Sequence, residues 1–237
     1  MPSIASPAMV GLLAAVTVGA AILTLLSAEY VSILGAAFVM GLTQVGGLCG
    51  CAHVKTMSEL WRSNRRTWLK ATAAYTAAGL LSATVTGAAT GMLGALLGAA
   101  GQPRLVTFVA AIAALLAARE LRLLTFPFPD WPRRTDRTWA YAFGWTTAAA
   151  MWGFHIGVGF ATVITYPGFW ALVALILATG TVGSGVAIFG AYWLGRTLPL
   201  WLAPVLRHTR ALDVGIAYPA YRPLHAIALL WLAVALQ

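Results

Sequence analysis

The sequence predicts an all-α membrane protein with about seven transmembrane helices, and three observations lead to this prediction. First, 60% of the 237 residues are hydrophobic and 9% are charged, whereas about a quarter of the residues are charged in an ordinary soluble domain. Second, the mean hydropathy is +0.83. Third, the basic residues gather in short segments between long apolar stretches. So few charges cannot cover a water-exposed surface, so a lipid bilayer is the expected solvent. No nucleic-acid partner is expected, because the basic segments are typical of membrane topology.

A helix needs about 20 apolar residues to cross the hydrocarbon core of a bilayer. The stretches of this kind are, in order, residues 8–27, 31–54, 71–100, 105–125, 139–165, 169–195 and 219–236. Helices are expected rather than strands, because backbone groups in lipid must be paired within their own segment. The N-terminus lacks the basic region of a signal peptide, so the first stretch is expected to stay as a helix. A single transmembrane domain over residues 1–237 follows.

The basic residues predict the orientation of these helices. They occur after the second, fourth and sixth stretches, and only Arg104 of the 15 falls on the other side. Lys and Arg are retained in cytoplasmic loops, so we expect a multi-pass protein of the bacterial inner (plasma) membrane with a cytoplasmic N-terminus. Several tryptophans lie at the same boundary, where amphipathic rings are favoured. The stretch 198–218 is expected to lie along this surface.

A weak internal similarity predicts an inverted repeat. Residues 36–43 and 140–147 both have an aromatic- and alanine-rich approach to a glycine. Each opens a run of three helices, and because three is odd, the two runs enter the membrane from opposite sides. We therefore expect an additional N-terminal helix (1–30), a first three-helix repeat (31–125) and a second one (138–237), as in many transporters.

Glycines spaced four residues apart predict close packing of the third helix. The pairs are Gly87 with Gly91, and Gly94 with Gly98. Small residues at this spacing let two helix backbones approach each other.

Residues 46–53 (GGLCGCAH) are the densest candidate site. The glycines favour a helix break or close packing. The thiols of Cys49 and Cys51, with the His53 imidazole two residues on, are suited to thiol exchange or to binding a soft metal. Buried cysteines can equally pack as small hydrophobic residues. On a helix the two thiols point about 200° apart, so their pairing requires unwinding. As metal ligands these three residues leave the coordination incomplete, so neither a metal nor another cofactor is expected.

The fifth stretch supplies further candidates for a substrate path, namely Thr146, Thr147 and His155. An ionisable side chain inside the bilayer is costly and therefore points to function. A neutral imidazole bonded to a threonine or a carbonyl is the alternative. All six acidic residues, including Glu120, fall in loops or at helix ends. This distribution disfavours an ion-coupled carrier, and no hydrolase or nucleotide-binding motif is present.

Two short motifs resemble those of a known family. Residues 143–148 (FGWTTA) resemble the F-x-x-G-W-T-P-C signature of the CcdA/DsbD transmembrane family, the cytochrome c biogenesis thiol–disulfide transporters. Residues 41–42 (GL), followed by Leu48 and Cys49, are similar in spacing to the family's other signature. The resemblance covers roughly residues 31–236 and implies two inverted three-helix repeats.

The resemblance also implies which residues react. Cys49 matches one of the family's two exchanging cysteines, whereas the second position falls on Ala148 and the proline before it is Thr147. The chain is therefore identified as a divergent member without the second-repeat cysteine. Exchange between the repeats cannot run unchanged, so Cys49 and Cys51 would have to replace the pair.

The implied function is transfer of reducing equivalents across the membrane, or assistance in maturation of periplasmic redox proteins. Some relatives in that family assist maturation of redox enzymes that include methylamine dehydrogenase. The expected partner is a thioredoxin-like protein or a periplasmic redox protein. One alternative is a permease for a small molecule or a soft metal on the same scaffold, with the cysteines, His53 and His155 lining its path. The other is a non-catalytic subunit of a membrane complex.

Overall fold

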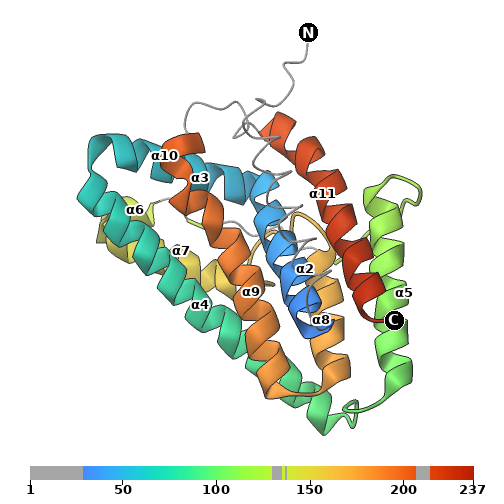
Figure 1. The fold of residues 1–237 in the computed structure, drawn as a ribbon. Coiled ribbons are helices and arrows are strands. Elements are labelled where there is room, and N and C mark those ends of the chain that lie inside the picture. The colour runs from blue at the N-terminus through green and yellow to red at the C-terminus, as the bar shows by residue number, and fades with distance from the viewer. Residues whose placement is uncertain (1–28, 130–134, 137, 207–213) are drawn as a thin grey trace.

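The computed structural model describes residues 29–129, 135–136, 138–206 and 214–237. These residues form helices and connecting loops, without a β-strand among them. The elements, labelled as in Figure 1, are α2 (Glu29–Thr43), η1 (Gln44–Gly46), α3 (Leu48–Ser63), α4 (Arg65–Leu96), α5 (Pro103–Glu120), α6 (Trp139–Phe143), α7 (Trp145–Gly157), α8 (Gly168–Thr179), α9 (Val182–Trp201), α10 (Ala203–Leu206) and α11 (Val214–Ala235). The predicted helix 8–27 lies outside the described residues.

The long helices α4 and α9 pack against each other and run antiparallel (Figure 1). Glycines allow their backbones to touch. A Cβ added to Gly87 would lie 2.1 Å from the Gly185 carbonyl oxygen, and one added to Gly185 would lie 2.0 Å from the Gly87 oxygen. Further along, a Cβ at Gly91 would lie 2.2 Å from the Thr181 oxygen. Close packing of the third predicted helix is therefore present, with α9 as its partner.

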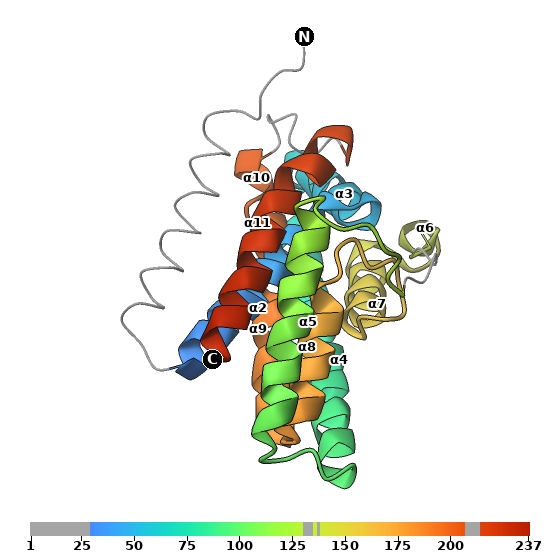
Figure 2. The same ribbon diagram turned by 90° about the vertical axis from the view of Figure 1, so that its right-hand side faces the viewer.

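The basic segments gather at one pole of the bundle. Figures 1 and 2 place α3, the start of α4, α10 and the start of α11 at this pole. The connections from α4 to α5 and from α8 to α9 lie at the opposite pole. Arg65 and Arg66 begin α4, whereas Arg104 is the second residue of α5. The poles therefore differ in charge in the way that the sequence pattern indicates.

The prediction of about seven transmembrane helices is not supported. In the part of the chain that the structure describes, α4 alone is long and apolar enough to cross a membrane by length and composition. A second span arises if Tyr30–Gly46 and Cys49–Ser63, bent by 78°, are taken together. The correct statement for the described residues is the coarser one, an all-helical protein.

Several predicted helices are interrupted, which explains the difference. The predicted helix 31–54 breaks between α2 and α3, where glycine-rich residues lower helix propensity. The predicted helix 139–165 is split at Gly144, whose φ of 76° lies in the left-handed region, and it ends at Gly157. The predicted helix 169–195 is two helices, because Gly180 ends α8 with a φ of 58° and the Thr181 side chain caps α9.

The segment 198–218, which is expected to lie along the membrane surface, is instead partly helical and belongs to several elements. Its first residues complete α9, which continues to Trp201, and α10 follows. Residues 207–213 lie outside the described residues. From Val214 the chain enters α11, which contains Pro219 and Pro223.

Candidate functional site

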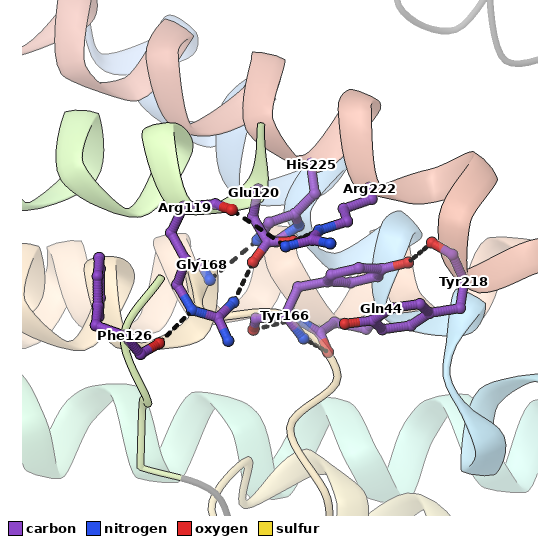
Figure 3. Close-up of polar contacts among 9 residues, drawn as sticks. All are labelled: Gln44, Arg119, Glu120, Phe126, Tyr166, Gly168, Tyr218, Arg222 and His225. Atoms are coloured by element: carbon purple, nitrogen blue, oxygen red, sulfur yellow. Dashed lines mark hydrogen bonds and ion pairs between the residues drawn. The ribbon is translucent and has the colours of Figure 1, made fainter. Parts of the chain in front are cut away.

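The break between α2 and α3 lies at the centre of a buried polar cluster. Thr43 and Gln44 are fully buried, although they interrupt an otherwise apolar stretch. The loop before α8 approaches the break so closely that a Cβ at Gly47 would lie 1.9 Å from the Thr165 hydroxyl oxygen. Helix α11 closes the other side with Tyr218, Tyr221 and His225. We call Thr43, Gln44, Tyr166, Tyr218 and His225 the break network (Figure 3, which labels all of them except Thr43).

Gln44 pairs with the backbone of the loop before α8. Its side-chain Nε2 donates to the Tyr166 carbonyl at 3.0 Å (Figure 3). Its Oε1 accepts from the Thr165 amide at 3.0 Å. The loop residues lack a helical partner for these groups, and a buried backbone group without a partner is costly. The Gln44 amide therefore holds the loop against the break.

His225 links α11 to both neighbouring segments. The Gly168 amide donates to His225 Nε2 at 3.0 Å, so Nε2 is the acceptor nitrogen. The proton of the neutral ring then sits on Nδ1, which donates to the Thr43 hydroxyl at 2.6 Å. Thr43 in turn donates to the Met40 carbonyl at 2.8 Å. This relay is complete only with a neutral imidazole, because a proton on Nε2 would face the Gly168 N–H.

Tyr166 stacks between two rings of α11. Its ring lies 5.3 Å from that of Tyr218 at 10° and 4.9 Å from that of His225 at 23°. Its hydroxyl donates to the Tyr218 carbonyl at 2.6 Å (Figure 3). This bond ties the loop before α8 to the backbone of α11.

A buried ion-pair cluster lies next to the break network. Glu120, the last residue of α5, has a fully buried side chain and bridges Arg119 and Arg222. Arg222 Nε donates to Glu120 Oε2 at 2.9 Å, and Arg119 donates to the other carboxylate oxygen (Figure 3). The sequence correctly places Glu120 at a helix end, but the end itself is buried.

Cys49 and Cys51 face different surroundings. The Cys51 thiol donates to the Val45 carbonyl at 3.2 Å and lies near Tyr166 and Tyr221. Cys49 lies on the opposite side of α3, near Tyr75 and Arg196. Both are buried thiols. The structure therefore agrees with the expectation that two thiols at this spacing point apart.

His53 and Arg196 complete the cluster around Cys49. His53 Nδ1 bonds the Cys49 carbonyl at 2.6 Å, and its ring packs against Tyr75 and Trp152 at 5.8 and 5.3 Å. Arg196 is 5% exposed, and its guanidinium donates to the Tyr192 hydroxyl at 3.3 Å. Among the described residues, no carboxylate lies within ion-pair distance of Arg196.

The other predicted site residues lie apart from this cluster. Thr146 and Thr147 are exposed in the first turn of α7. His155 is half-buried and packs on Trp139 with a ring distance of 6.1 Å, and its buried Nδ1 has no hydrogen-bond partner among the described residues. The structure thus brings Cys49, Cys51 and His53 together around α3 but places the α7 candidates elsewhere. Over the described ranges, no group of three His, Cys, Asp or Glu side chains is arranged to hold a metal.

Sequence reasoning missed the residues that make most polar contacts in the interior. Gln44 and His225 lie inside predicted spans, and the rule that polar groups within a span point to function would have found both. The sequence pattern indicates only a topology signal for Arg196 and Arg222. Their burial follows from contacts between helices far apart in the chain, which no local pattern reveals.

Comparison with known proteins gives two relatives of low identity. The chain is 26% identical over 207 residues to the methylamine utilization protein MauF of Methylorubrum extorquens, covering 80% of this chain and 70% of the relative. It is 25% identical over 186 residues to the MauF protein of Paracoccus versutus, covering 76% of this chain and 68% of the relative. No family model and no solved structure matches the chain.

These relatives correct the assignment made from the short motifs. The relatives are named for methylamine utilization, and their family is distinct from the CcdA/DsbD transporters. The resemblance of residues 143–148 to a thiol–disulfide signature is therefore misleading: six residues without the Pro-Cys are too short to outweigh a match over 207 residues. Thiol–disulfide transport and cytochrome c biogenesis are wrong predictions, and the permease and structural-subunit alternatives gain no support. The chain is similar over most of its length to MauF proteins.

Proposed function

We propose that this chain acts in methylamine utilization. The observation that carries the proposal is the similarity to two MauF proteins from different organisms over at least 76% of the chain. The aligned length is too great to be confined to one helix or motif, so it includes much of the bundle that holds the break network. The proposal assigns the chain to a process and leaves its individual step open to the experiments below.

Deletion of the gene in its native organism tests this role. Growth on methylamine should be lost, and growth on a substrate that does not contain methylamine should be unchanged. Re-expression of the full chain should restore growth. A deletion strain that grows normally on methylamine would overturn the proposal.

We also propose that the chain is embedded in a bacterial inner membrane. The interior is polar in places, with buried Gln44, Arg196 and His225, whereas large apolar side chains point outward. Those on α4, α5, α9 and α11 include Leu81, Val85, Leu96, Phe108, Leu115, Val182, Leu194, Ile227 and Val234. Soluble monomers rarely expose large continuous apolar patches. A lipid environment accounts for both the apolar exterior and the polar interior.

Membrane location and orientation can be tested together. The chain should stay in the membrane pellet after a carbonate wash. Ser63 and Gln102 are exposed at opposite poles, and Cys49 and Cys51 are buried. With the basic pole in the cytoplasm, an impermeant maleimide should label Gln102→Cys in intact cells and Ser63→Cys only after permeabilisation. Extraction by carbonate would contradict membrane insertion, and the reverse labelling would contradict the orientation.

The fold also supports an inverted repeat, with boundaries that differ from the predicted 31–125 and 138–237. A broken helical segment followed by two long helices occurs twice, as α2 and α3 before α4 and α5, and as α7 and α8 before α9 and α11. The reciprocal contact of Gly87 and Gly185, each against the other's carbonyl, is what a two-fold axis between antiparallel helices requires. We propose that the two runs are related by such an axis.

A further inference from the structure

An open cavity lies beside the ion-pair cluster, at the basic pole of the bundle. Its volume is about 390 Å³, and it is lined by Arg119, Leu124, Thr125, Phe126, Pro127 and Arg222. The arginines come from the end of α5 and from α11, and the remaining residues belong to the chain that leaves α5. Two helices and a loop thus direct two guanidinium groups at one space.

The charges at this cavity do not cancel. Among the described residues, Glu120 is the single carboxylate in contact with the two arginines, and both of its oxygens are occupied. One negative and two positive charges leave a net positive charge on the cavity wall. The Glu120 side chain is fully buried, whereas the side chains of both arginines keep 18% of their surface exposed. The excess positive charge therefore faces the opening.

The arginines are fixed in place but retain unused donors. Arg119 Nε donates to the Phe126 carbonyl at 2.8 Å, and its guanidinium lies 4.5 Å from the Phe128 ring centroid. Arg222 Nη2 donates to the Arg119 carbonyl at 3.1 Å. Among the described residues, none accepts a hydrogen bond from Nη2 of Arg119 or from Nη1 of Arg222. Two rigidly held guanidinium groups with free N–H groups are suited to a tetrahedral oxyanion.

We propose that this cavity binds a phosphate group, with Arg119 and Arg222 donating to its oxygens. Glu120 acts as a positioning residue, because it holds both guanidinium groups while its own oxygens are already bonded. The apolar walls formed by Leu124, Phe126 and Pro127 suit a phosphate that carries an organic substituent. A phospholipid headgroup and a soluble phosphate compound share this chemistry. The proposal is independent of the role in methylamine utilization.

The test measures binding to the full chain in detergent and in lipid nanodiscs. The first probe is inorganic phosphate, and titration calorimetry measures its binding to the chain in detergent. The second probe is phosphatidylglycerol in nanodiscs of phosphatidylcholine, and native mass spectrometry measures its binding. We expect saturable binding of at least one probe, and the probe that binds identifies the source. Arg222→Gln should weaken this binding at least tenfold. Arg122→Gln, which removes an exposed arginine outside the cavity lining, should leave it unchanged.

A loop variant keeps the proposal testable if Arg222→Gln does not fold. Thr125 is exposed and lines the cavity, so its replacement leaves the ion pairs intact. Thr125→Glu places a negative charge at the opening and should weaken binding at least tenfold, whereas Thr125→Gln, of similar size and neutral, should bind as the parent chain does. Binding that is equal in both Thr125 variants, or absent for both probes in the parent chain, would overturn the proposal.

Discussion

The side-chain amide of Gln44 supplies the backbone at Tyr166 with the hydrogen-bond partners that a neighbouring strand or helix would otherwise supply. It donates to the Tyr166 carbonyl at 3.0 Å and accepts from the amide of the preceding residue, Thr165, at 3.0 Å. Gln44 itself follows the last residue of α2, where the helix has just broken. The Gln44 side chain therefore joins the break in one helix directly to the loop before another.

Replacement of Gln44 by methionine keeps the volume and removes both bonds. Two buried backbone groups are left unpaired, and each costs about 1–3 kcal/mol. We expect Gln44→Met to lower the free energy of unfolding by about 3 kcal/mol, measured by denaturant unfolding in detergent. Gln102→Met is the control, because Gln102 is exposed and its amide bonds only the Gly98 carbonyl of its own turn. Equal losses in the two variants would show that the Gln44 contacts carry no special weight.

The glycines at the α4–α9 contact lead to a second prediction. A Cβ at Gly91 would lie 2.2 Å from the Thr181 carbonyl oxygen, and the two helices would have to separate. Overpacking of this kind costs about 1–3 kcal/mol, so Gly91→Ala should lower the thermal unfolding midpoint. Gly183 is also in α9, yet a Cβ there meets nothing within 4 Å. Gly183→Ala should be neutral or gain up to about 1 kcal/mol from helix propensity. A similar midpoint for both variants would argue against the glycine contact.

The sequence predicts well that the chain is helical, but it predicts poorly where each helix begins and ends. Glycine spacing correctly indicates close packing at Gly87, Gly91 and Gly94, but Gly98 lies in open space with a φ of 67° and ends the helix. Hydropathy merged α8 and α9 into one span, because the apolar composition continues through their turn. The cap residues indicate the break: Gly180 is typical of a helix C-terminus, and Thr181 is typical of a helix N-terminus.

The candidate site was predictable only where its residues are neighbours in the chain. Cys49, Cys51 and His53 lie within five residues of one another, and the structure keeps them on α3. The contact of Thr43 with His225 joins residues separated by 182 positions, and no single-sequence pattern encodes such a pair. The same holds for Glu120 and Arg222, whose ion pair depends on how α5 and α11 pack.

The positions of the two thiols predict their behaviour under oxidation. Cys51 points toward the Val45 carbonyl, and Cys49 lies on the Arg196 side of α3. A disulfide requires the sulfurs to come within about 2 Å of each other, so the first turns of α3 would have to unwind. We expect mild oxidation of the folded protein to leave the intact mass unchanged, and the same treatment of the unfolded chain to form the bond. Rapid disulfide formation in the folded chain would contradict this geometry.

Arg196 is the buried residue that we expect to matter most for the proposed role in methylamine utilization. It is 5% exposed, and its guanidinium donates to a neutral hydroxyl, that of Tyr192. Within the described residues, no carboxylate forms an ion pair with it. Burial of a charge costs several kcal/mol, and even a buried ion pair can often be replaced by hydrophobic residues without loss of stability. A folding role therefore does not explain the residue, and we expect its charge to serve function.

The variant Arg196→Met should accordingly accumulate and unfold at the same temperature as the parent chain or higher, while failing to restore growth on methylamine to the deletion strain. Arg196→Lys keeps the charge but not the planar guanidinium, so partial growth would separate the need for charge from the need for geometry. Arg62→Met, at an exposed position of α3, should restore growth fully. Full growth with Arg196→Met would place the methylamine role elsewhere in the molecule, and a large loss of stability would mean that the arginine is structural after all.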